Sequence, residues 1–375
     1  MENKGRIRLL DILRGIAVLG TLGTNIWIFA HLGDLTYITT IDYSGWWQAE
    51  DLIRMIVLFL VNGKLLGLLT IMFGVGMELK YQQAMRQGRA WPRVYVWTAI
   101  FLIIEGLIHY TLVMEYDILM SYGVTAIFVM FIIMRGERFM KRIMVLIGSI
   151  HAAIILLLFV AGLFANISLG SFDGVVALYH GGTWMEQVQY RLLNFLPLRM
   201  EAIFIIPMNV FLFLLGVLLM RSGVFSPDEN GKRQRNKLLK LGIFLGLPLN
   251  MLIFIPGGAF DLPVRYLFAP LLSLGYISFI SIMVEYWKWG WLWRGFENVG
   301  KMSLSCYLMQ NILSSIIFYG WGLALGGKVG TLTIIMLWLI ISLLQIVFAS
   351  IWLHIYKTGP LEMVRQHTVK ALMSK

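Results

Sequence analysis

The sequence predicts an all-α polytopic membrane protein with about ten transmembrane helices and with both termini in the cytoplasm. Of its 375 residues, 59% are hydrophobic and only 14% are charged, and the mean hydropathy is +0.77. Soluble domains carry roughly 45–50% apolar and about 25% charged residues. Apolar runs of roughly 18 or more residues recur along the whole chain, and each is long enough to cross a bilayer as a helix. These observations exclude a soluble enzyme, a secreted disulfide scaffold and a disordered protein.

Ten apolar segments follow one another, and we expect each of them to form one helix. The first has no small-residue cleavage site behind a short apolar core, so we expect it to be retained. The segments cover approximately residues 9–32, 52–78, 93–113, 117–134, 143–166, 199–220, 238–256, 264–287, 299–323 and 330–356.

Basic residues set the predicted orientation. Most of the 31 Lys and Arg residues flank the segment ends that face the cytoplasm if the N-terminus is inside, which is the positive-inside pattern. The net charge of +11 therefore reflects topology in the plasma membrane, and nucleic acid is not expected as a partner.

Two polar stretches are more than simple connections. Residues 222–237 predict a cytoplasmic linker between an N-terminal transmembrane half (1–221) and a C-terminal one (238–375). Residues 184–198 are amphipathic and are expected at the outer membrane surface. Tryptophans are expected in two interfacial belts, with Trp46 and Trp47 outside and Trp287, Trp289, Trp291 and Trp293 inside.

Ionisable residues inside the apolar segments are the first candidates for function, because a charge at the bilayer centre costs about 2.5–3.5 kcal/mol. Asp11 and Arg14 lie three residues apart on one helix face and can form an ion pair. Arg14, Val18, Thr21 and Asn25 continue as one stripe from the inner to the outer leaflet. The stripe is a candidate substrate path. The alternative is an interfacial arginine with a buried amide that helps helices to pack.

The second and third segments add a lysine, a glutamate and a histidine. Lys64 follows Asn62 and Gly63 too deep in the membrane to reach the interface, so it requires a carboxylate or an anionic ligand, and Glu105 is the expected partner. Glu105 and His109 lie four residues apart, and a histidine oriented by a carboxylate can act as a general base. A hydrogen-bonded structural histidine is the alternative. The glycines of the second segment, Gly63, Gly67, Gly74 and Gly76, favour close helix packing and also permit a break in the helix.

The remaining candidates lie near the outer ends of the segments and in the second half. Arg199 and Arg265 are outward-facing arginines suited to holding an anionic group through bidentate hydrogen bonds, with lipid headgroup contact as the alternative. Asp117 and Gln310 complete the set. No metal site is expected, because Cys306 is the only cysteine.

The run from Arg8 to Gly20, followed by Asn25, resembles the opening of the YeiB-like family of bacterial membrane proteins. Four further stretches agree with this family over essentially the whole chain. They are Gly63–Lys64 with Phe73–Gly76; Gly106–His109 with Tyr116–Leu119 and Tyr122; Asn298–Gln310; and Gly359–Glu362.

This family is distantly similar to the transmembrane acyltransferases, including the lysosomal heparan glucosaminide acetyltransferases. The shared pattern is Asp11, Arg14–Gly15 and Asn25. The resemblance implies transfer of an acyl group from cytosolic acyl-CoA to an acceptor on the outer face. The acyltransferase-three relatives carry a histidine where this sequence has Asn25, and the nearby His31 has a different spacing.

Two functional hypotheses follow, beside the plain alternative of a structural or signalling protein whose polar residues only pack. In an acyltransferase, Arg8, Arg14, Lys80 and Arg86 would hold the donor. The catalytic group would be His109, Glu105, Lys64 and Asn25, and the substrate-binding group Asp11, Arg14, Asp117, Arg199, Arg265 and Gln310. In a transporter of a small anionic or lipid-like metabolite, Lys64, Arg14 and Arg265 would be charge partners, and Glu105 with His109 a proton relay. Both hypotheses require the lipid bilayer and a small-molecule or lipid-like substrate, and a homodimer stays an open option.

Overall fold

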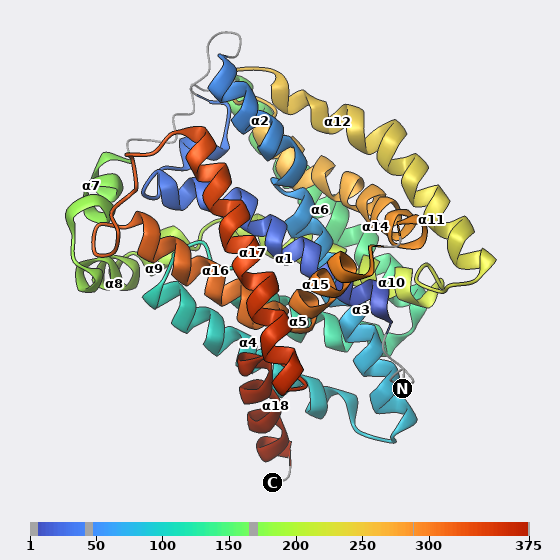
Figure 1. The fold of residues 1–375 in the computed structure, drawn as a ribbon. Coiled ribbons are helices and arrows are strands. Elements are labelled where there is room, and N and C mark those ends of the chain that lie inside the picture. Colours follow the sequence, from blue (N-terminus) through green and yellow to red (C-terminus); the bar gives the residue numbers. More distant parts are fainter. Residues whose placement is uncertain (1–6, 42–47, 165–171, 288, 374–375) are drawn as a thin grey trace.

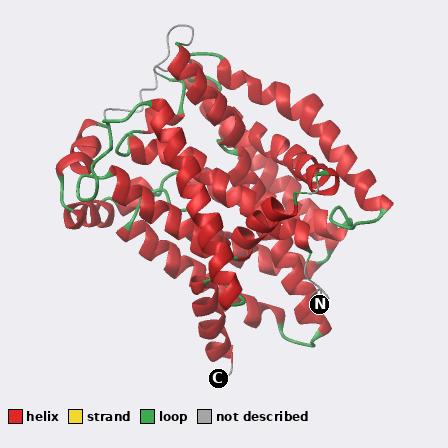
Figure 2. Cartoon of the chain, in the orientation of Figure 1, coloured by secondary structure: helices red, strands yellow, loops and turns green. Residues whose placement is uncertain are grey.

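The computed structural model describes residues 7–41, 48–164, 172–287 and 289–373, and these residues form only helices and loops (Figure 2). Eight helical stretches are long and apolar enough to cross a membrane, and two shorter apolar helices lie at 119–135 and 303–318. Each of the ten predicted segments therefore coincides with an apolar helix, and the prediction of an all-α polytopic protein is confirmed. The helices of these spans are α1 (Arg8–Ala30), α2 (Ala49–Val61) with α3 (Lys64–Arg86), α4 (Trp91–Leu112), α5 (Leu119–Ile132), α6 (Glu137–Phe164), α9 (Phe195–Leu198) with α10 (Ala202–Arg221), α11 (Glu229–Leu241) with α12 (Leu247–Met251), α13 (Asp261–Pro263) with α14 (Ala269–Tyr286), α16 (Ser303–Phe318) and α17 (Thr331–Ile355).

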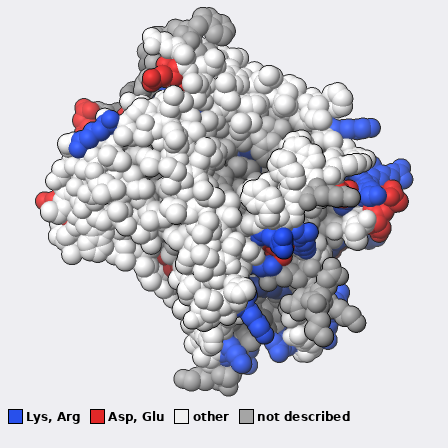
Figure 3. Space-filling model, viewed as in Figure 1, with Lys and Arg blue, Asp and Glu red and all other residues white. Residues whose placement is uncertain are grey.

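Charge divides the molecule into two ends. The start of α1 and the end of α18 lie on the same side of the bundle (Figure 1). Most of the Lys and Arg side chains of the visible face lie toward that side, while the broad middle of that face carries almost no charge (Figure 3). The positive-inside rule assigns this basic end to the cytoplasm, and we call it the inner end. Helix α18 (Pro360–Met373) projects from it beside α4.

Glycines allow the central helices to touch backbone to backbone. A Cβ on Gly15 of α1 would lie 1.9 Å from the carbonyl oxygen of Phe296, and a Cβ on Gly300 would lie 1.8 Å from the carbonyl oxygen of Asp11. Helix α15 (Gly290–Lys301) therefore crosses α1 at a distance that no larger residue permits. Gly74 and Gly216 create a second crossing of this type between α3 and α10.

A break in the second segment lies at Gly63, which separates α2 from α3. Its φ of +75° is a left-handed conformation that glycine adopts without steric cost. A Cβ here would also lie 2.7 Å from the carbonyl oxygen of Arg265, so the break packs directly on the segment that precedes α14.

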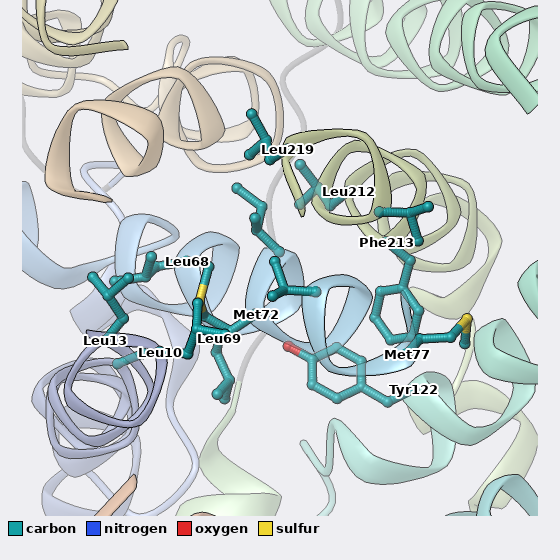
Figure 4. Close-up of a cluster of buried hydrophobic side chains, with 14 of the residues drawn as sticks. Leu10, Leu13, Leu68, Leu69, Met72, Met77, Tyr122, Leu212, Phe213 and Leu219 are labelled. Carbon is teal, nitrogen blue, oxygen red and sulfur yellow. The ribbon is translucent and has the colours of Figure 1, made fainter. Parts of the chain in front are cut away.

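Helix α3 lies at the centre of the core. Leucine and methionine side chains from it pack against α1, α10 and Tyr122 of α5 (Figure 4). This packing holds α1, α3 and α5 around a common space, which contains the site described below.

Three surface predictions need comment. The second part of the predicted linker 222–237 is helical. Helix α11 begins at Glu229, Asp228 accepts a hydrogen bond from the Gly231 N–H at its start, and Arg235 is buried against Glu285 at 2.8 Å. The amphipathic stretch 184–198 forms α8 (Trp184–Leu193) and α9, and it packs with α7 (Asp173–Gly181) at the outer end. Trp287, Trp289 and Trp291 are exposed at the start of α15 whereas Trp293 is buried, and Trp46 and Trp47 lie outside the described residues.

Candidate active site

A cavity of about 430 Å³, the inner cavity, lies among α1, α3, α4, α5, α16 and α18. Arg14, Lys80 and Arg365 give its lining a positive charge. Arg14 lies 3.4 Å from Asp11, as the spacing predicted. Three basic side chains at one cavity form a site suited to a multiply charged anion.

A wider space of about 790 Å³, the vestibule, continues from the inner cavity toward the inner end and shares Lys80 and Arg365 with it. Further basic residues in its lining are Arg89, Arg93 and Lys370. Two residues expected at this mouth are absent from the linings of both spaces. One is Arg86. The other is Arg8, whose Nε forms an ion pair with Oε2 of Glu297 at 2.9 Å.

The pairing of Arg8 is favourable for both partners. Burial alone would raise the pKa of Glu297, but hydrogen bonds from Lys301 and Arg8 lower this pKa below its ordinary value. Arg8 is therefore part of the contact between α1 and α15 and does not contribute to the basic mouth.

Helix α18 is held in place by a buried carboxylate. Glu362 accepts hydrogen bonds from the N–H groups of Leu304 (2.8 Å) and Ser305 (3.3 Å) at the first turn of α16, and from the Ser305 hydroxyl. A carboxylate at a helix N-terminus satisfies free N–H groups and interacts favourably with the helix dipole. Arg365, one turn further along α18, is thereby positioned at the inner cavity.

A second cavity, the outer cavity of about 250 Å³, lies toward the opposite end. Its charged lining residues are Glu201, Asp261 and Arg265, and Asn25 and Asn62 add amides. Arg265, which the sequence analysis assigned to the outer side, lies in the lining of this outer cavity.

Of the residues that the structure describes, only Tyr307 and Ile118 appear in the linings of both the inner and the outer cavity. We call these two residues the partition. The stripe of α1 passes it in order, since Arg14 and Val18 line the inner cavity and Thr21 and Asn25 line the outer one. The four residues of the stripe thus line the two cavities in chain order, and its role as a substrate path stays a prediction.

His109 lies beside the partition and is completely buried. Its Nδ1 is 2.9 Å from Oδ1 of Asp117, its Nε2 is 3.3 Å from the amide nitrogen of Asn311, and its ring centre is 5.5 Å from that of Tyr307. With the proton on Nδ1, the Asp117 carboxylate accepts a hydrogen bond from Nδ1 and Nε2 accepts one from the Asn311 amide, so both neighbours fix the orientation of the imidazole ring.

Asp117, and not Glu105, is the carboxylate that orients this histidine. The other oxygen of Asp117 accepts from the Met120 N–H at the start of α5. Both oxygens of Glu105 are without a hydrogen-bond partner among the described residues. The expectation of a Glu105–His109 pair is therefore wrong, because the chain turns back after α4 and brings Asp117 closer.

Lys64 is fully buried at the first position of α3, but it does not pair with Glu105. Its ammonium lies 5.6 Å from the ring centre of Phe59, and it has no hydrogen-bond partner in the part of the chain that the structure describes. The expected ion pair is absent between these two described residues, and Lys64 is not part of either cavity lining.

Arg199 and Gln310 have structural partners. Arg199 donates to the main-chain carbonyl of Asp117 (2.9 Å) and to the Ser121 hydroxyl (3.0 Å), so it braces the turn that carries Asp117 and is not in the lining of the outer cavity. Gln310 donates to the Thr21 hydroxyl at 3.3 Å and joins α16 to the stripe.

Sequence reasoning did not single out Tyr307, Arg365 or Glu362 for a role. Their only signal was their place in or next to two stretches that resemble one family, and nothing in the sequence showed that these stretches touch. Tyr307 is 2% exposed, and its hydroxyl lies beside Asn311 and the Ile118 backbone without a hydrogen bond of good geometry to the described residues.

Comparison with known proteins shows similarity to bacterial proteins over nearly the whole chain. Residues 219–371 match the family described as protein of unknown function DUF418. The chain is 25% identical to the uncharacterized protein YxaH of Bacillus subtilis strain 168, over 95% of this chain and 92% of that protein. It is 27% identical to the uncharacterized protein YeiB of Escherichia coli strain K12, over 96% of each chain. An uncharacterized 39.9 kDa protein of Bacillus acidopullulyticus is 25% identical over 96% of this chain and 92% of its own length. The chain is therefore similar over nearly its whole length to YxaH and YeiB, and its second half matches the DUF418 family, as the resemblance to YeiB-like proteins led us to expect.

Proposed function

We propose that this protein works in the plasma membrane as an acyltransferase, which transfers an acyl group from a cytosolic acyl-CoA to an acceptor at the outer face. One observation carries the proposal. A basic inner cavity and a polar outer cavity approach each other from opposite ends, and within the described part of the chain only Tyr307 and Ile118 line both. A buried histidine–carboxylate pair lies beside that partition.

Each part of this arrangement suits one part of the reaction. Arg14, Lys80 and Arg365 would bind the phosphates of the donor by charge-assisted hydrogen bonds. His109, oriented by Asp117, would take a proton from the acceptor hydroxyl or amine as this group forms its bond to the acyl carbon. The carbon–sulfur bond breaks in the same sequence, and the proton on His109 passes to the leaving thiolate. The Asn25 amide would stabilise the developing oxyanion.

The test uses the purified protein in nanodiscs with radiolabelled acetyl-CoA and a membrane extract as the source of acceptor. We expect donor binding and a labelled product, and we expect His109→Ala to abolish product formation while donor binding persists. His180→Ala is the matched control, because His180 is exposed on α7 away from both cavities. If the wild-type protein neither binds the donor nor transfers the label, the proposal is wrong.

A transporter is the second candidate, because two cavities with a thin shared partition also suit alternating access. The buried Lys64 and Glu105 side chains, which have no hydrogen-bond partners among the described residues, are the kind of intramembrane charges that transporters use. Flux of a small anion into proteoliposomes without a covalent product would favour this candidate. A labelled product without net flux would favour the enzyme.

A further inference from the structure

The outer cavity holds three charged side chains, and one of them has its hydrogen bonds within the protein. Asp261 accepts from the Thr40 N–H at 2.7 Å and from the Thr40 hydroxyl at 3.0 Å. Its carboxylate therefore ties the segment before α14 to the loop after α1. The two remaining charges are Glu201 at the start of α10 and Arg265.

Glu201 and Arg265 line the same cavity without forming an ion pair. No nitrogen of Arg265 lies within 4 Å of a Glu201 oxygen among the ion pairs of the described residues, and Nε of Arg265 is buried without a hydrogen-bond partner there. The nearby Arg199 does not neutralise Glu201 by contact, since its guanidinium donates to Asp117 and Ser121. A cation and an anion in one cavity that do not contact each other leave both groups available to a ligand.

A third group in the cavity independently indicates a ligand. Asn62 is 3% exposed and its Nδ2 donates to the Ile38 carbonyl at 3.2 Å, but its Oδ1 has no partner among the residues described. A buried amide oxygen without a donor costs about 1–3 kcal/mol. A ligand that donates a hydrogen bond would remove this cost.

We propose that the outer cavity binds a small zwitterion, which places an anionic group against Arg265 and an ammonium group against Glu201 and Asn62. The side chains specify this class, because a simple anion would leave Glu201 and Asn62 without a donor, and a simple cation would lie beside an unpaired guanidinium. The volume of about 250 Å³ equals about eight water molecules at about 30 Å³ each, which fits a molecule of amino-acid or phosphoethanolamine size.

This inference rests on the proposed function, for which it names the chemical class of the acceptor. The ammonium group would give one proton to the Glu201 carboxylate, and the resulting amine would form its bond to the acyl carbon while His109 takes the second proton and the carbon–sulfur bond breaks. The same chemistry has two sources, which are a free zwitterionic metabolite and the headgroup of phosphatidylethanolamine. The binding measurement below uses no acyl donor, so zwitterion binding without acyl transfer would refute the enzyme and leave the site standing. Acyl transfer to neutral acceptors only, without zwitterion binding, would support the enzyme and refute the zwitterion site.

The experiment measures binding of phosphoethanolamine, inorganic phosphate and ethanolamine to the full chain in phosphatidylglycerol nanodiscs by isothermal titration calorimetry. The wild-type protein is expected to bind phosphoethanolamine at least about tenfold more tightly than it binds inorganic phosphate or ethanolamine. Arg265→Gln should weaken phosphoethanolamine and phosphate alike, whereas Glu201→Gln should weaken phosphoethanolamine and strengthen phosphate. Arg265→Lys should retain binding, which separates loss of charge from misfolding.

Matched controls on the outer side are Lys328→Gln and Glu50→Gln, two exposed positions outside the cavity, and neither should change any affinity. Exchange of phosphatidylglycerol for phosphatidylethanolamine distinguishes the sources. If phosphatidylethanolamine weakens the binding of free phosphoethanolamine, the natural ligand is a lipid headgroup. If the affinity for phosphoethanolamine is unchanged, the natural ligand is a free metabolite. The proposal is overturned if phosphate binds the wild-type protein as tightly as phosphoethanolamine, or if monodisperse Arg265→Gln and Glu201→Gln proteins bind as the wild type does.

Discussion

Truncation of Tyr307 is expected to connect the two cavities. Tyr307 and Ile118 alone among the described residues line both spaces, so Tyr307→Ala should join the inner cavity of about 430 Å³ to the outer cavity of about 250 Å³. Tyr307→Phe keeps the ring in place. Truncation of a buried aromatic side chain costs about 3–5 kcal/mol in a filled core. The cost here should lie at the low end, because the ring already borders empty space on two sides.

The assay follows the reaction of an introduced cysteine with a membrane-impermeant thiol reagent added from the outer side of oriented proteoliposomes. Thr98→Cys reports on the inner cavity and Thr24→Cys on the outer cavity, both in a Cys306→Ala background. In the Tyr307→Ala protein, the cysteine at position 98 should react at least about tenfold faster, which corresponds to a barrier lowered by about 1.4 kcal/mol.

The controls decide what such a change means. The cysteine at position 24 should react at the same rate in all backgrounds, and Tyr307→Phe should leave position 98 protected. Thermal unfolding of each variant shows whether the fold persists. If position 98 stays equally slow in a folded Tyr307→Ala protein, Tyr307 does not separate the cavities and the reasoning from the shared lining is refuted.

Three further predictions concern the elements that position the site. Glu362→Ala removes the acceptor of two N–H groups of α16 and should cost about 1.5–3 kcal/mol, measured as faster protease cleavage of α18, while the exposed Gln366→Ala should have no effect. Gly300→Ala places a Cβ 1.8 Å from a main-chain oxygen of α1 and should destabilise the fold by at least about 1–3 kcal/mol. In the control Gly290→Ala, the added Cβ meets open space. Equal melting temperatures of the two variants would contradict the close crossing of α1 and α15. Burial, and then the positive charge of Arg54 in α2, lower the pKa of His31 from 6.5 to about 3. Between pH 6.5 and about pH 3 the unfolded chain therefore binds more protons than the folded protein. Stability should therefore fall as pH drops below 6.5, by up to about 1.4 kcal/mol per unit, and His31→Gln should flatten this dependence in thermal unfolding.

The sequence was most informative where a single helix determines the outcome. Helical spacing alone places Arg14, Thr21 and Asn25 on one face, so the polar line of α1 was predictable. The glycines of the second segment allowed a break as well as close packing, but their spacing did not select Gly63 as its place.

Predictions failed where a partner comes from another part of the chain. The spacing rule selected Glu105 for His109, but the turn between α4 and α5 delivers Asp117, and the geometry of that turn is not encoded in any periodicity. Arg365 reaches the inner cavity only because Glu362 docks α18 on α16. Such contacts between distant segments depend on the assembled bundle.

The crossing of α1 and α15 has a consequence for how the protein is made. The first helix to enter the membrane meets its glycine partner only after the ribosome has translated as far as Gly300. At about 5–20 residues per second this takes roughly 15–60 s. During that time Asp11 and Arg14 lie in lipid without α15, and their mutual neutralisation lowers the cost of waiting. A variant with only one of these charges should therefore be prone to faulty insertion and degradation during biosynthesis, before any question of activity arises.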